Sequence, residues 1–61
     1  MNIKQYLIEM YTAQANEHAR LADFYRTPRN AANIMSMGMR RLCIREHQEA
    51  AQRYAQEAAQ Q

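Results

Sequence analysis

The chain of 61 residues contains no tryptophan, one cysteine, one proline and one glycine. The lone cysteine, Cys43, excludes a disulfide within the chain and is typical of a reducing compartment. With Pro28 and Gly38 as its only strong helix breakers, the sequence offers little material for strands joined by tight turns. It also lacks any run of roughly 18 apolar residues, so we expect neither a membrane-spanning helix nor a signal peptide. These scarcities predict a soluble, cytoplasmic protein.

The residues that are abundant favour helices. Alanine, glutamine, glutamate, arginine and methionine are all good helix formers, and hydrophobic residues make up 48% of the chain. This apolar content, with a formal net charge of only +2, argues against disorder. A chain of this length buries only about 60% of the surface of its unfolded form, and alanine adds little apolar area. The expected core is therefore thin, and association with another chain would compensate for it.

Apolar residues recur at spacings of three and four, the period of an α-helix, in two segments. The first segment predicts a helix over residues 3–25. Thr27 and Pro28 predict a break after a short turn at 26–27, because threonine caps helices and proline favours the first helical position. A second helix is expected over 28–60, with a bend near 36–38 allowed by Gly38.

Short connections favour antiparallel neighbours. The sequence therefore predicts one all-α domain over residues 1–61, an antiparallel two-helix hairpin that assembles as a dimeric four-helix bundle or a higher oligomer. The predicted oligomer interface or core consists of the larger apolar residues of both helices: Ile3, Leu7, Met10, Leu21, Phe24, Met35, Met39, Leu42 and Tyr54.

Positive charge is concentrated in the middle of the chain. Residues 26–45 contain no acidic residue, whereas residues 1–25 and 46–61 are net negative. The candidate residues for binding a partner or an anion are Arg26, Arg29, Arg40, Arg41 and Arg45, with Tyr11 and Tyr25. Arg41 and Arg45 share a helix face at i, i+4 spacing. The alternatives are a solvated face that pairs with acidic helix segments, an acidic protein surface, or a nucleotide or nucleic acid.

No metal site and no cofactor is expected. Methionines 35, 37 and 39 are spaced two apart, so they point in different directions on a helix and do not converge on one ion. Cys43 and His47 supply only two of the four ligands of a structural zinc site. His18 and His47 are expected as ordinary surface or interface residues. Nothing in the spacing ties Ser36, the only serine, to a histidine, so we expect no enzyme.

The function expected from these features is that of a small non-enzymatic binding protein. It would be a regulator or inhibitor, of the kind that phages encode, and would dock on a host or cognate macromolecule through its helical faces and its Arg-rich segment. The alternatives are an oligomer that sequesters an anionic, nucleotide-like ligand, and a nucleic-acid-binding helical protein.

Overall fold

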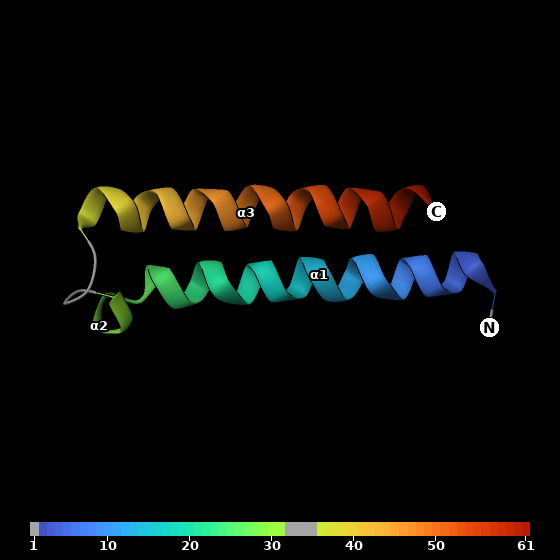
Figure 1. Ribbon diagram of the computed structural model, residues 1–61, viewed down its shortest axis with the longest axis horizontal. Coiled ribbons are helices and arrows are strands. Elements are labelled where there is room, and N and C mark those ends of the chain that lie inside the picture. The colour runs from blue at the N-terminus through green and yellow to red at the C-terminus, as the bar shows by residue number, and fades with distance from the viewer. Residues whose placement is uncertain (1, 32–35) are drawn as a thin grey trace.

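The computed structural model describes residues 2–31 and 36–61. These residues form three helices, α1 (Ile3–Arg26), α2 (Pro28–Ala31) and α3 (Met37–Gln60), and no strand. The two long helices, α1 and α3, lie antiparallel and side by side, with α2 at the connected end (Figure 1). The predicted all-α helical hairpin is therefore confirmed.

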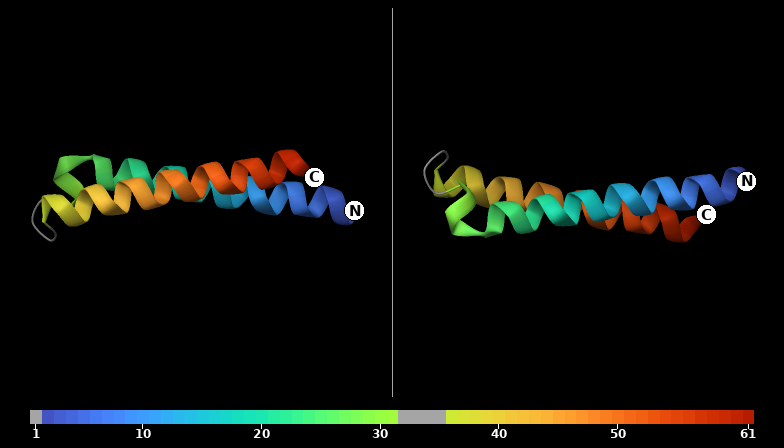
Figure 2. Two further views of the ribbon diagram at one scale, coloured as in Figure 1. Left: turned by 90° about the horizontal axis from the view of Figure 1, so that it is seen from above. Right: turned by 90° about the horizontal axis from the view of Figure 1, so that it is seen from below.

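The hairpin is a single layer of two helices. Its extents of 45 × 16 × 11 Å accommodate two long helices side by side, with the four-residue α2 at their connected end. Views from above and below show that α1 and α3 stay side by side along their length and are inclined to each other at a shallow angle (Figure 2). Each long helix is therefore covered along one stripe only, and the remaining faces have no partner among the described residues.

Helix α1 begins and ends with side-chain caps. The Asn2 side chain accepts a hydrogen bond of 2.7 Å from the backbone N–H of Gln5. At the other end, Thr27 adopts an extended conformation, as expected for the residue before Pro28. Its backbone N–H and its hydroxyl both donate to the carbonyl of Asp23, at 3.2 Å and 3.0 Å. The hydroxyl of Thr27 thus closes α1, whereas the sequence predicted that it would cap the following helix.

The second half of the chain differs from the helix predicted over 28–60. Helix α2 ends at Ala31, and Ser36 is extended, with φ −67° and ψ 161°. The Ser36 hydroxyl accepts a hydrogen bond of 3.2 Å from the backbone N–H of Met39, so it caps a separate helix, α3. Gly38 lies within the first turn of α3, and a Cβ atom there would meet nothing within 4 Å. No close approach of another backbone explains this glycine.

The seam between α1 and α3 is built mainly from small residues and rings. Three side chains are buried among the described residues: Ala15, Ala22 and Ala50, with exposed fractions of 9%, 2% and 7%. Half-buried residues continue the seam at spacings of three and four, as in an antiparallel coiled coil. They are Ile8, Tyr11, His18 and Tyr25 on α1, and Arg40, Cys43, His47, Tyr54 and Ala58 on α3.

The large apolar residues predicted as interface or core are not enclosed by the single chain. Leu7, Leu21 and Tyr54 are half-buried, and Met35 lies outside the described residues. The remaining five are 36–78% exposed: Ile3, Met10, Phe24, Met39 and Leu42. These five are exposed because two helices in one layer cover only a narrow stripe of each other. Their role in an oligomer interface stays a prediction.

Candidate functional site

Five aromatic and imidazole rings follow one another along the seam and alternate between the two helices. In order from the connected end they are Tyr25, His47, His18, Tyr54 and Tyr11, and we refer to them as the ring ladder. Successive ring centroids lie 5.8, 5.1, 5.5 and 6.2 Å apart. The ring ladder supplies the bulk that the buried alanines lack, so it determines how α1 and α3 meet at mid-length.

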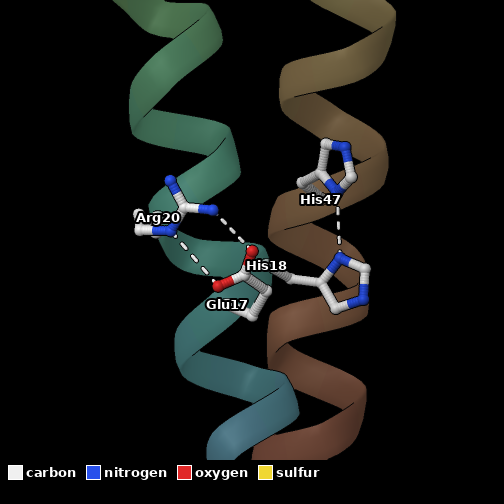
Figure 3. A network of polar contacts seen from close by, with 4 residues as sticks. All are labelled: Glu17, His18, Arg20 and His47. Carbon is white, nitrogen blue, oxygen red and sulfur yellow. Dashed lines mark hydrogen bonds and ion pairs between the residues drawn. The ribbon is translucent and has the colours of Figure 1, made fainter.

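At the centre of the ring ladder, the Nδ1 atoms of His18 and His47 lie 2.9 Å apart (Figure 3). The centroid separation of 5.1 Å matches two imidazoles that meet edge to edge through these nitrogens. The contact is therefore a hydrogen bond in which one Nδ1 donates and the other accepts, with the roles set by the tautomers. Two residues that are 29 positions apart in the sequence are joined in this way.

An arginine and a carboxylate lie beside this histidine pair on α1. Arg20 donates from Nη2 to Oε1 of Glu17 at 2.5 Å and from Nε to Oε2 at 3.2 Å (Figure 3). The Arg20 hydrogen bond lowers the pKa of the Glu17 carboxyl, and Glu17 raises the pKa of Arg20. Both side chains are more than half exposed, so solvent screens the pair and it adds little stability. Among the described hydrogen bonds, none joins Glu17 to the histidines.

The structure brings two of the five predicted arginines together. Arg41 and Arg45 line a shallow hollow on α3 with Gly38 and Leu42. Arg26, in the last turn of α1, instead forms an ion pair of 2.7 Å with Asp23.

The other predicted site residues lie elsewhere. Arg40 is half-buried at the seam, and Arg29 is exposed on the four-residue α2. Tyr11 and Tyr25 belong to the ring ladder, where their rings contact Tyr54 and His47. The predicted arrangement of tyrosines beside arginines is therefore not seen at the hollow, because the tyrosine rings are engaged between the helices.

The first turns of α3 combine exposed apolar groups with this positive charge. Met37, Met39 and Leu42 are 61%, 53% and 40% exposed, and Arg41 and Arg45 are exposed beside them. We call these five residues the α3 entry surface. Among the described residues, the ion pairs are those of Arg20 and Arg26, so the arginines of the α3 entry surface remain available to a partner.

A second shallow hollow lies between the long helices and contains the Arg26–Asp23 ion pair. It is lined by Ala19, Ala22, Asp23 and Arg26 from α1 and by Gln48, Ala51 and Gln52 from α3. Small and amide side chains dominate this lining, and it holds no pair of nucleophile and base. Neither hollow has the composition of a hydrolytic site.

Comparison with models of protein families, with curated proteins and with solved structures gave no match for this chain. Within residues 2–31 and 36–61, no helix is both long and apolar enough to cross a membrane.

Proposed function

We propose that this protein is a small non-enzymatic regulator or inhibitor that docks on an acidic surface of a macromolecular partner. The observation that supports this function is the composition of the α3 entry surface, where Arg41 and Arg45 form no ion pair among the described residues and lie at helical spacing beside the exposed Met37 and Leu42, with Met39 exposed on another side of the same turns. The protein would be encoded by a phage, and its partner would be a protein of the host.

Each component of the α3 entry surface suits protein recognition. Methionine adapts its shape to different partners, and arginine and methionine are both enriched in protein interfaces. Positive charge around the apolar groups speeds encounter with an acidic surface and selects against basic ones.

An acidic protein surface is favoured over a nucleotide or nucleic acid as the partner. Recognition of bases by single-stranded nucleic-acid binders depends on exposed aromatic rings. Tyr11 and Tyr25, the tyrosines among the predicted site residues, are half-buried in the ring ladder. The arginines at the hollow have methionine and leucine as neighbours instead, which suits a protein surface.

Association of the chain with itself forms the second part of this proposal. Ile3, Tyr6 and Met10 share one face of the first turns of α1 and are 78%, 56% and 36% exposed. They lie at the free end of the hairpin, away from the α3 entry surface at the connected end (Figure 1). Two copies that cover these residues form a four-helix bundle and leave the α3 entry surface open to a partner.

Charge reversal within the full chain tests the docking proposal. We expect Arg41→Glu with Arg45→Glu to abolish capture of acidic proteins from a host lysate and to leave helicity unchanged. Lys4→Glu with Arg53→Glu is the matched control, because both residues are exposed and lie outside the α3 entry surface. Equal capture by the two double variants would refute the proposed site. Calorimetric binding of a nucleotide that depends on Arg41 and Arg45 would support the sequestering alternative instead.

A further inference from the structure

In the histidine pair, metal-binding side chains from both long helices converge. His18 and His47 bring their Nδ1 atoms to within 2.9 Å of each other, with their ring planes 29° apart. From this geometry we propose that the two residues form a binding site for a divalent transition-metal ion of the zinc, nickel or copper class, which bridges α1 and α3.

The distance between the two nitrogens suits such an ion after a small adjustment. Two ligand nitrogens at the usual distance from a tetrahedral zinc are about 3.3 Å apart, so the Nδ1 atoms of His18 and His47 separate by a few tenths of an ångström. Both rings also turn so that their Nδ1 atoms, which point at each other in the hydrogen bond, point toward the ion instead. The ring that donates the hydrogen bond carries its proton on Nδ1, and this proton moves to Nε2 of the same ring. Both imidazoles then present an Nδ1 lone pair and stay neutral, which is the form that binds metal.

The neighbouring rings support the two ligands. Tyr25 lies parallel to His47 within 3°, and Tyr54 lies parallel to His18 within 9°. These contacts restrict the rotation of the imidazoles, and orientation of the ligands by surrounding side chains raises the affinity of metal sites. Both histidines are half-buried, so an ion can reach the nitrogens from solvent.

Water completes the coordination. Within the described part of the chain, no third histidine, cysteine, aspartate or glutamate joins a group that could hold a metal. A site with two imidazole ligands selects ions that prefer nitrogen and discriminates against magnesium and calcium, which prefer oxygen ligands. The bound ion holds the hairpin closed, because the unfolded chain does not keep the two imidazoles together.

Titration of the full chain with zinc or nickel chloride tests this site, with magnesium chloride as the reference ion. We expect one ion to bind per chain. The melting temperature should rise by roughly 5–10 °C when the free ion is at ten times its dissociation constant, and magnesium should produce no rise. His18→Gln and His47→Gln should each weaken zinc binding at least tenfold.

Cys43→Ser is the matched control, because Cys43 lies one helical turn before His47 at the seam. Zinc binding should persist in this variant, and its loss would overturn the proposed ligand pair. Unchanged zinc binding in the His18→Gln, His47→Gln double variant would also overturn the proposed ligand pair.

A measurement on the unaltered protein tests the site even if the histidine variants fail to fold. Zinc should shift the Nδ1 resonances of both histidines in a long-range ¹H–¹⁵N spectrum, and unmoved resonances would reject the site.

Discussion

Tyr25 of α1 and His47 of α3 lie with their ring planes 3° apart and their centroids separated by 5.8 Å. This near-parallel contact orients His47 so that its edge meets His18, and Tyr54 orients His18 in the same manner from the other side. The rings of the ring ladder therefore pack between α1 and α3 at positions that leucine and isoleucine occupy in most coiled coils. The stability of the hairpin should depend on the tyrosines of the ring ladder more than on its exposed aliphatic residues.

Replacement of Tyr54 by alanine tests this dependence. Tyr54 contacts both Tyr11 and His18, so the substitution removes two ring contacts at once. Because Tyr54 is only half-buried, we expect a loss of about 2 kcal/mol in the free energy of unfolding, less than for a fully buried aromatic residue. Chemical denaturation at low protein concentration measures it. Tyr6→Ala is the control, since Tyr6 is 56% exposed and lies outside the ring ladder, and an equal loss there would contradict the prediction.

A pH dependence of stability is expected from the ion pair of Glu17 and Arg20. The hydrogen bond from Arg20 lowers the pKa of the Glu17 carboxyl. The contribution of the pair is complete above the ordinary pKa range of a glutamate and is lost only as the pH falls through the lowered value. Both side chains are more than half exposed, so this contribution is small. Glu17→Gln should therefore lower the melting temperature slightly at neutral pH and leave it unchanged in strong acid, and a difference that grows as the pH falls would contradict this prediction.

The sequence predicted the hairpin because its strongest signals are local. Helical spacing, the scarcity of helix breakers and the Thr27–Pro28 break each depend on neighbouring residues. The sequence predicted a possible bend near 36–38 but not the start of a separate helix there, because a serine within a run of good helix formers gives only a weak capping signal. Ser36 becomes a cap only when its backbone is extended, with ψ at 161°.

The candidate sites were predicted less well than the fold, for a different reason. Alternating spacings of three and four connect Tyr11, Ala15 and His18, and this pattern could have placed His18 in a seam. The register between α1 and α3, by contrast, depends on the path of the connecting segment, which no residue spacing defines. The pairing of His18 with His47, and the engagement of Tyr25 away from the arginines, therefore became visible only in the structure.

The cap of α3 provides a direct test of the division between α2 and α3. Ser36→Ala removes the acceptor for the backbone N–H of Met39, and we expect it to cost about 1 kcal/mol of unfolding free energy. Ser36→Asp retains an acceptor and should restore most of that stability. Urea denaturation of the three proteins measures both effects. No change in Ser36→Ala would mean that the helix does not begin at Met37.

Gly38 should tolerate alanine well. A Cβ atom at this position meets nothing within 4 Å, and no glycine among the described residues has a positive φ. Alanine lowers the entropy of the unfolded chain and raises helix propensity, so Gly38→Ala should stabilise the hairpin by roughly 0.5–1 kcal/mol. Thermal unfolding followed by circular dichroism reports the change. A destabilised variant would indicate that another chain packs closely against Gly38.

Self-association should depend on the start of α1 and be independent of the α3 entry surface. Met10→Ala removes a side chain that is 36% exposed, so it should change the stability of dilute protein by less than about 1 kcal/mol. If two copies cover Met10, the same substitution weakens the dimer, and the mass from light scattering should fall toward that of one chain. Leu42→Ala is the matched control, because Leu42 is similarly exposed at 40% but lies at the other end of the hairpin. A single-chain mass for the unaltered protein at every concentration would exclude the dimer, whereas loss of the dimer in Leu42→Ala alone would move the self-association surface to α3.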